Sequence, residues 1–141
     1  MSEPLVDTVD IKAVVTDPVQ VVSFNLYTVT SADLAFTAPF QMPIRRNDFI
    51  HALIAWFDID FSSGHKLVRF STGPHTKYTH WKQTVFYLKD VLAVNEGEFV
   101  SGVLESKPNA KNPRDLDIKI SYSLDTEEDS RQKSGVCNYV M

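Results

Sequence analysis

The 141-residue sequence has few of the residues that several common kinds of site require. It has a single cysteine, Cys137, so an intramolecular disulfide is excluded and packing must hold the fold together. Its five glycines are isolated and form no Gly-x-Gly-x-x-Gly or phosphate-binding loop, so we expect no cofactor-binding residues. The four histidines lack metal-ligand spacing and a cysteine partner, so we expect no metal site.

An excess of basic charge and long apolar runs are also missing. There are 18 acidic and 14 basic residues, with no basic stripe, so direct binding of nucleic acid is not expected. No apolar stretch reaches the roughly 20 residues of a membrane-spanning helix. The first seven residues show neither the basic start nor the apolar run of a secretory signal. We therefore expect a soluble, intracellular protein without a membrane partner.

The sequence is rich in alternating apolar and polar positions. Hydrophobic residues make up 43% of the chain, enough for the core of one domain. The clearest alternation is in residues 116–124, where Leu116, Ile118 and Ile120 begin one apolar face. Further strands are expected at residues 22–26, 49–61, 67–71, 82–88, 99–105 and 135–140. The pattern predicts an all-β fold in which residues 1–141 form a single barrel-like domain of mostly antiparallel strands.

Helical structure is expected only as a short turn. Ser31-Ala32-Asp33-Leu34 can form one with Ser31 as its cap, and Pro39 limits its extension. Turn signals such as Ser62-Ser63-Gly64 and Asn95-Glu96-Gly97 separate the expected strands. Residues 125–134 contain almost no apolar side chain, which predicts a flexible hairpin tip.

Two pairs of carboxylates have the spacing that places both groups on one face of a strand: Asp58 with Asp60, and Asp115 with Asp117. Such a pair can serve as a general acid and base or bind a cation. Alternating polar positions are also what a solvated sheet face requires. We favour the solvated face for both pairs.

Two smaller charged clusters also allow two interpretations. Arg45-Arg46, followed by Asp48, is either an anion-binding spot or an exposed edge whose charge discourages strand pairing. Glu127-Glu128-Asp129 either attracts arginine-rich peptides or forms a solvated turn. The structural interpretation is favoured in both cases.

One loop combines groups that suit a functional site. Residues 74–87 place a histidine, hydroxyl groups and large aromatic rings beside a proline turn, immediately before an expected strand. Thr79-His80-Trp81 is the centre of this segment. The alternative is core packing, with the Trp81 indole as a buried anchor.

The segment Tyr78-Thr79-His80-Trp81-Lys82-Gln83-Thr84 resembles the Thr-His-Trp loop of the protein arginine methyltransferases. Other segments match the family in the same order: Glu3-Pro4-Leu5-Val6-Asp7, Phe70-Ser71-Thr72-Gly73-Pro74, Pro108-Asn109-Ala110-Lys111-Asn112 and Arg114-Asp115-Leu116-Asp117. The resemblance spans almost the whole chain. It is to the principal type I enzymes, especially their fungal form.

The resemblance implies the C-terminal β-barrel domain of such an enzyme. In the family, a Rossmann-like domain that binds S-adenosylmethionine precedes the barrel, and the substrate arginine lies between the two. The match covers the barrel alone, so we expect this chain to lack the cofactor domain, its glutamate loop and the dimerisation arm. A guanidinium is a poor nucleophile that carboxylates must align against the methyl-bearing sulfonium. We therefore expect the isolated chain to be inactive.

The resemblance also implies roles for three residues of the loop. Thr79 and Trp81 would be substrate-binding, and Trp81 would pack beneath the substrate-facing loop. His80 would be catalytic: it would pair with a carboxylate of the cofactor domain and accept the proton lost on methylation.

For the complete enzyme, the resemblance implies a homodimer in nucleus and cytoplasm. It would form monomethyl and asymmetric dimethyl arginine in arginine- and glycine-rich proteins, such as histones and RNA-binding proteins. The alternative from another class is a stand-alone barrel that binds peptides or proteins and has no catalytic role.

Overall fold

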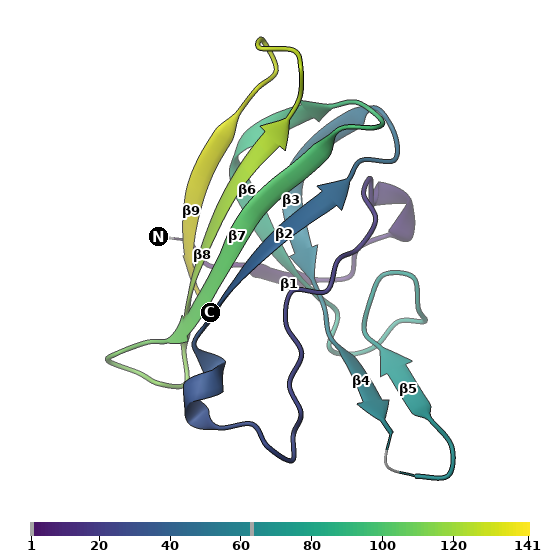
Figure 1. Ribbon diagram of the computed structural model, residues 1–141, viewed down its shortest axis with the longest axis vertical. Coiled ribbons are helices and arrows are strands. Elements are labelled where there is room, and N and C mark those ends of the chain that lie inside the picture. The colour runs from purple at the N-terminus through teal and green to yellow at the C-terminus, as the bar shows by residue number, and fades with distance from the viewer. Residues whose placement is uncertain (1, 63) are drawn as a thin grey trace. The chain divides into compact units, whose positions relative to one another are not determined.

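The computed structural model describes residues 2–62 and 64–141, and it confirms an all-β fold with mostly antiparallel strands (Figure 1). The expected turn Ser62-Ser63-Gly64 includes Ser63, which lies outside the described residues. The elements, in chain order, are β1 (Leu5–Asp7), η1 (Ile11–Ala13), η2 (Ser31–Leu34), β2 (Phe36–Pro43), β3 (Asp48–Ala55), β4 (Asp58–Phe61), β5 (Val68–Ser71), β6 (Gln83–Val94), β7 (Phe99–Pro108), β8 (Leu116–Asp125) and β9 (Ser134–Val140).

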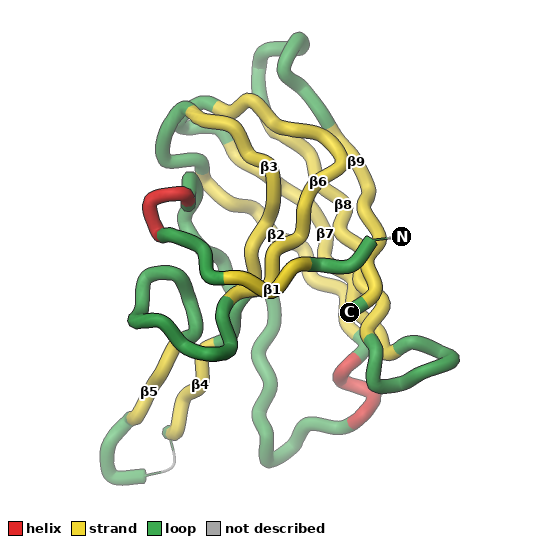
Figure 2. Tube along the Cα trace, turned by 180° about the vertical axis from the view of Figure 1, so that it is seen from behind, coloured by secondary structure: helices red, strands yellow, loops and turns green. Residues whose placement is uncertain are grey.

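The strands form three sheets with the orders β1-β6-β3, β2-β7-β8-β9 and β4-β5 (Figure 2). The chain divides into two compact units. The large unit contains residues 2–3, 15–51 and 88–141, and the small unit contains residues 4–14 and 52–87. None of the helices formed by the described residues is long and apolar enough to cross a membrane.

Strand β8 supplies much of the core of the large unit, as its alternation predicted. Ile118, Ile120, Tyr122 and Leu124 are all buried, and the residues between them are more exposed. Burying an aliphatic side chain of this size stabilises a fold by roughly 1.5–3 kcal/mol. The period-two pattern therefore fixes which face of β8 points inward, because a shift of one residue would expose the whole apolar set.

Strand β2 was not predicted, and its sequence contains two prolines. Pro39 lies inside the strand and pairs in register with Val103 of β7. Proline has no backbone N–H and is tolerated in a sheet mainly at an edge. Strand β2 is the edge strand of the order β2-β7-β8-β9, which is the place in a sheet where a residue without an N–H is tolerated.

The strand predicted at residues 22–26 is wrong. This segment forms no strand with any other described residue, and Leu26 is 78% exposed. The Asn25 side-chain oxygen accepts a hydrogen bond from the Tyr27 amide at 3.0 Å, and the Asn25 carbonyl accepts one from Thr28 at 3.0 Å. Asparagine stabilises turns through such local bonds, so a turn replaces the extended backbone that the alternation suggested.

The single strand predicted at residues 49–61 is two strands, β3 and β4. The break falls at Phe57, whose N–H and C=O both bond to Thr72: Phe57 N donates to Thr72 Oγ1 at 3.1 Å, and Thr72 N donates to Phe57 O at 3.0 Å. Thr72 is 1% exposed. The buried Thr72, which directly follows β5, therefore bonds to the Phe57 backbone groups between β3 and β4.

The expected helical turn is present as η2, but its cap is Thr30 rather than Ser31. The Asp33 carboxylate accepts a hydrogen bond from the Thr30 amide at 2.9 Å. This closes a capping box with the acidic residue at the third helical position.

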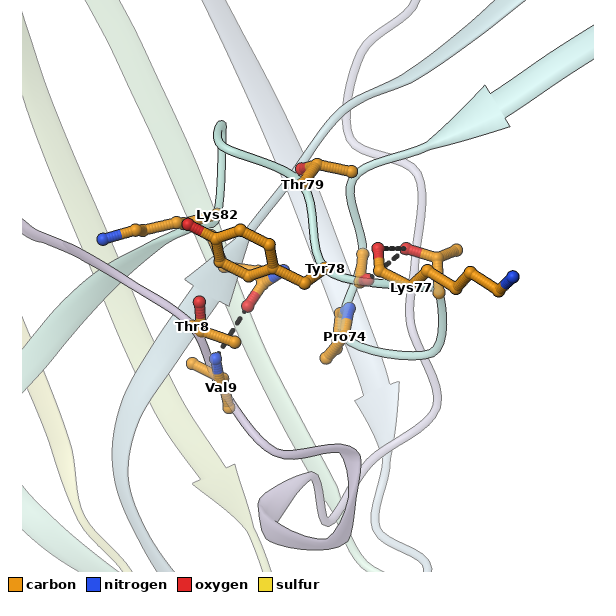
Figure 3. A pocket seen from close by; sticks show the side chains of 10 residues that line it. Thr8, Val9, Pro74, Lys77, Tyr78, Thr79 and Lys82 are labelled. Atoms are coloured by element: carbon orange, nitrogen blue, oxygen red, sulfur yellow. Dashed lines mark hydrogen bonds between the residues drawn. The ribbon is translucent and has the colours of Figure 1, made fainter.

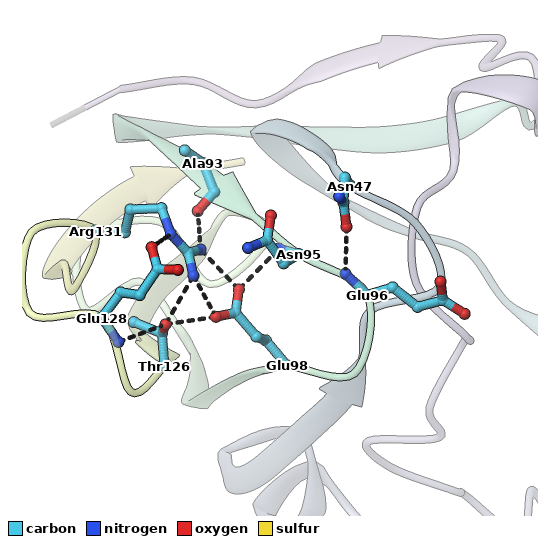
Figure 4. Close-up of polar contacts among 8 residues, drawn as sticks. All are labelled: Asn47, Ala93, Asn95, Glu96, Glu98, Thr126, Glu128 and Arg131. Carbon is cyan, nitrogen blue, oxygen red and sulfur yellow. Dashed lines mark hydrogen bonds and ion pairs between the residues drawn. The ribbon is translucent and has the colours of Figure 1, made fainter.

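The polar connection at residues 125–134 joins β8 to β9 as expected, but a compact polar network holds it (Figure 4). Arg131 donates two hydrogen bonds to Glu98, at 2.7 and 2.6 Å, and one to the Ala93 carbonyl at 2.9 Å. The Arg131 guanidinium and the Thr126 hydroxyl hold the pKa of Glu98 at about 2, below its ordinary 4.5. The connection is therefore tied to the turn between β6 and β7.

Candidate functional site

The candidate loop lies in the small unit, between the end of β5 and the start of β6. Near its end, the Lys82 amide donates to the Thr79 carbonyl at 3.2 Å, which closes a turn with His80 and Trp81 at the two central positions. Lys82 has φ 55°, the one positive φ of a non-glycine residue among the described residues. That conformation is strained for lysine, and such residues persist where the surrounding structure fixes them.

The rings of the turn belong to an aromatic cluster. His80 and Trp81 have ring centroids 4.0 Å apart. Trp81 also stacks on Phe70 at 5.9 Å and meets Phe57 edge-on at 5.8 Å, and Phe70 stacks on Phe61 at 6.5 Å. Trp81 nevertheless remains 47% exposed, so in this chain its indole is not a buried core anchor.

The base of the loop is closed by buried polar groups. Gln83 is 6% exposed, and its Nε2 donates to the Thr72 carbonyl at 2.7 Å. Its Oε1 accepts a hydrogen bond from the Val9 amide at 2.8 Å. Thr72 precedes the loop and Gln83 follows it. The Gln83 side-chain amide therefore joins the two ends of the loop. Neither residue was singled out in the sequence, although both lie within segments that carry the family resemblance.

The first part of the loop packs tightly around Gly73. A Cβ at this position would lie 2.5 Å from the His75 ring and 2.7 Å from Nε1 of Trp56. His75 in turn lies against Trp56, with ring centroids 5.9 Å apart. Thr76 also donates to the Gly73 carbonyl at 2.7 Å. The glycine thus lets the chain approach two rings closely as it enters the loop.

A small cavity of about 60 Å³ lies beside the loop (Figure 3). Its lining includes Tyr78, Thr79 and two lysines, Lys77 and Lys82, but no Asp or Glu among the described residues. The cavity is far below the ~300 Å³ of a typical small-molecule site. A guanidinium placed here would meet positive charge and no carboxylate. The described lining of this cavity therefore supplies no carboxylate that could pair with a guanidinium.

Each of the other charged clusters contains a residue that is paired within the described structure. Arg69 holds Asp60 in a two-pronged ion pair, at 2.6 and 3.0 Å, on the exposed face of the β4-β5 hairpin. Arg46 pairs with Asp48 at 3.0 Å. Asp117 accepts a hydrogen bond from the Asn109 amide at 2.9 Å. Within residues 2–62 and 64–141, no group of three His, Cys, Asp or Glu side chains is placed to hold a metal ion.

Comparison with protein families gives the class of this fold and loop. Residues 1–128 match the family described as the arginine methyltransferase oligomerization subdomain. The chain therefore belongs to the arginine methyltransferase family.

Individual relatives agree with that assignment. The chain is 55% identical over 124 residues to protein arginine N-methyltransferase 1.1 of Arabidopsis thaliana, covering 88% of this chain and 32% of the relative. It is 52% identical over 130 residues to protein arginine N-methyltransferase 1 of Schizosaccharomyces pombe, covering 92% of this chain and 38% of that one. The chain thus spans about a third of the length of these relatives.

Solved structures confirm the fold. A chain of the Trypanosoma brucei PRMT1 enzyme-prozyme heterotetrameric complex with AdoHcy superposes with a TM-score of 0.91 at 38% identity, over 99% of this chain and 44% of that one. Arabidopsis thaliana protein arginine methyltransferase 10 superposes with a TM-score of 0.90 at 16% identity, over 99% and 42%. The second likeness concerns the fold alone.

Proposed function

We propose that this chain is the barrel domain of a type I protein arginine methyltransferase, and that it presents the turn Thr79-His80-Trp81 to a cofactor-bearing partner domain. The observation that carries the proposal is this turn itself: it has the family's loop sequence, and it holds His80 and Trp81 exposed at its centre. The adjoining cavity offers no carboxylate among its described lining residues, so the turn supplies part of a site.

Within the complete enzyme, methyl groups pass from S-adenosylmethionine to arginine side chains, giving monomethyl and asymmetric dimethyl products. His80 pairs with a carboxylate of the cofactor domain and takes up the proton that the guanidinium loses. Thr79 and Trp81 line the path of the substrate. Arginine- and glycine-rich proteins, including histones and RNA-binding proteins, are the proposed substrates, acted on by a homodimer in nucleus and cytoplasm.

The proposal can be tested with a chimera in which this chain replaces the matched segment of the S. pombe relative. Transfer of labelled methyl groups from S-adenosylmethionine to an arginine- and glycine-rich peptide is the expected result. The isolated chain should transfer none. A correctly folded chimera without activity would contradict the domain assignment, and methylation by the pure chain would contradict its dependence on a second domain.

The substitution His80→Ala tests the residue within that chimera. Loss of a proton acceptor costs about 10²–10⁴-fold in turnover. Because His80 is exposed, the melting temperature should change little. His51→Ala is a matched control, since His51 is an exposed histidine on β3. If the melting temperature of His80→Ala falls enough for unfolding to account for the lost activity, His80 is purely structural.

The exposed aromatic cluster favours a second candidate, a stand-alone module that binds cationic peptides. Phe61 and Trp81 are 57% and 47% exposed, and aromatic faces of this kind attract guanidinium groups. Calorimetric titration of the chain with an arginine-rich peptide, at low salt and at about 0.5 M salt, tests it. Tight binding by the chain alone would support this candidate, and absence of binding at low salt would exclude it.

A further inference from the structure

We propose that Gln83 is a positioning residue for the candidate loop: its side-chain amide closes the loop and thereby sets the geometry of the turn that carries His80 and Trp81. The importance of that turn for a substrate rests on the function proposed above. The geometry of the turn does not depend on it.

The first step is the pair of contacts that Gln83 makes with two different segments. It donates from Nε2 to the Thr72 carbonyl at 2.7 Å and accepts at Oε1 from the Val9 amide at 2.8 Å; Figure 3 draws the bond from Val9. An uncharged amide supplies a donor and an acceptor at once, which neither a carboxylate nor an ammonium group can do. At 6% exposure, water is poorly placed to substitute for either contact.

The second step links Gln83 to the turn. The Gln83 backbone is fixed in β6, where it pairs in register with Asp7 of β1. Lys82 is the one residue between this anchored position and the turn, and it carries the strained φ of 55°. Its amide closes the turn on the Thr79 carbonyl. The direction of the turn is therefore set where the chain leaves Gln83.

The third step concerns the far end of the loop. The Gln83 side chain bonds to Thr72, whose own hydroxyl donates to the Phe57 carbonyl at 2.9 Å. Phe57 supports the Trp81 ring edge-on at 5.8 Å. Gln83 thus controls Trp81 by two routes, through the backbone at Lys82 and through Thr72 and Phe57. Loss of the amide should disturb Trp81 before it disturbs the rest of the fold.

Two variants separate the contacts. Gln83→Leu keeps the approximate size and removes both hydrogen bonds. Gln83→Glu keeps an acceptor for the Val9 amide, but its carboxylate cannot donate to the Thr72 carbonyl. Asn109→Leu is the matched control in the large unit, because the Asn109 amide likewise secures a loop, donating to Asp117 at 2.9 Å and accepting from Lys111 at 2.9 Å.

The measurements use the full chain and require no activity. Amide hydrogen exchange is followed at Val9 and Lys82. The indole N–H resonances of the two tryptophans, Trp56 and Trp81, are followed by NMR. In Gln83→Leu, exchange at Val9 and Lys82 should accelerate about tenfold, the effect of losing one such bond. The Trp81 resonance should move, and amides of β7 and β8 should keep their rates.

Gln83→Glu should retain protection at Val9 while Lys82 and Trp81 respond as in Gln83→Leu. Lowering the pH until the introduced carboxylate is protonated gives that side chain an O–H donor for the Thr72 carbonyl, so both signals should return toward those of the unsubstituted chain. A purely structural residue would show no such recovery. If Gln83→Leu fails to fold, Gln83→Glu decides the question alone.

The proposal is overturned if Lys82 and Trp81 keep their signals in the folded Gln83 variants, or if Asn109→Leu changes them equally. In the chimera with the S. pombe relative, Gln83→Glu should lower kcat with a smaller effect on KM. Its kcat relative to that of the unsubstituted chimera at the same pH should partly recover in acid. An inactive unsubstituted chimera would count against the proposed function. The role of Gln83 in positioning the turn would then be decided by the hydrogen-exchange and NMR measurements on the chain itself.

Discussion

Two loops of this chain, residues 125–134 and residues 72–82, are secured in opposite ways. In the first, the Arg131 guanidinium reaches from the loop itself to Glu98 and the Ala93 carbonyl, and its side chain is only 17% exposed (Figure 4). In the second, the buried polar contacts lie at the base, on Thr72 and Gln83, while Trp81 stays half exposed. The first loop is held by contacts of a residue within it, and the second is held at its base while its central turn stays exposed.

The two loops therefore differ in which groups they keep exposed: the Arg131 side chain is 17% exposed and Trp81 is 47% exposed. In the hairpin connection, the Arg131 guanidinium is already paired with Glu98 and Glu128 and gains little from a further contact. A turn that keeps aromatic and imidazole rings in water, on a closed base, has its geometry set in advance and can bind without first being ordered. Variants at matched positions in the two units can test this contrast.

The largest loss of stability is expected from Gly102→Ala in β7. A Cβ there would overlap the backbone carbonyl oxygen of Ser121 and lie 2.6 Å from the Phe40 ring. Because a backbone atom inside the four-stranded sheet cannot move aside, we expect the free energy of unfolding to fall by about 3 kcal/mol or more. Urea denaturation followed by far-UV circular dichroism measures it, and a loss below about 1 kcal/mol would contradict the overlap.

Arg131→Met should be the next most severe. It removes a guanidinium whose ion pair with Glu98 is largely shielded, with side chains 17% and 15% exposed, and we expect a loss of about 2 kcal/mol. Arg69→Met is the control, because the Arg69–Asp60 pair is 62% and 45% exposed, and solvent screening should make its loss much smaller than that of Arg131→Met. If the free energy of unfolding falls equally in Arg131→Met and Arg69→Met, shielding from solvent does not make the Arg131–Glu98 pair more stabilising than the exposed pair.

Acid should release the first loop. The pKa of Glu98 is lowered from 4.5 to about 2 in the folded chain, chiefly by Arg131, so the unfolded chain binds more protons between these values. The stability contributed by Glu98 is therefore present above about pH 4.5 and is lost as the pH falls through about 2. The urea midpoint measured across this window should fall less steeply in Arg131→Met. If the urea midpoint depends on pH equally in Arg131→Met and in the unsubstituted chain, carboxylates other than Glu98 cause the loss of stability in acid.

A smaller effect on stability, with a more local consequence, is expected for Gly73→Ala than for Gly102→Ala. The added Cβ would meet the His75 ring and Nε1 of Trp56, which are side-chain atoms that can move, so we expect a loss of about 1 kcal/mol. The Trp56 indole resonance should shift, while the amides of the large unit keep their exchange rates. A loss as large as that of Gly102→Ala would mean that the small unit tolerates distortion no better than the sheet.

Much of the fold could be predicted from the sequence because it depends on local periodicity. The alternation in residues 116–124 gave β8 and its buried face, and the turn signal at Asn95-Glu96-Gly97 matches a glycine with φ 89°. The errors arose where a tertiary partner outweighs the local pattern. Pro39 is acceptable in β2 because no strand lies beyond that edge, and Phe57 leaves its ladder because Thr72 bonds to its backbone.

The candidate site divides in the same way. The loop around Thr79-His80-Trp81 and the other matching segments were enough to indicate the family, because sequence and order along the chain carry that information. They could not reveal that Trp81 is half exposed, that Lys82 is left-handed, or that Gln83 closes the loop on Thr72. Those features depend on groups brought together across the chain, such as Val9 and Gln83, 74 residues apart, and only the tertiary structure decides such pairings.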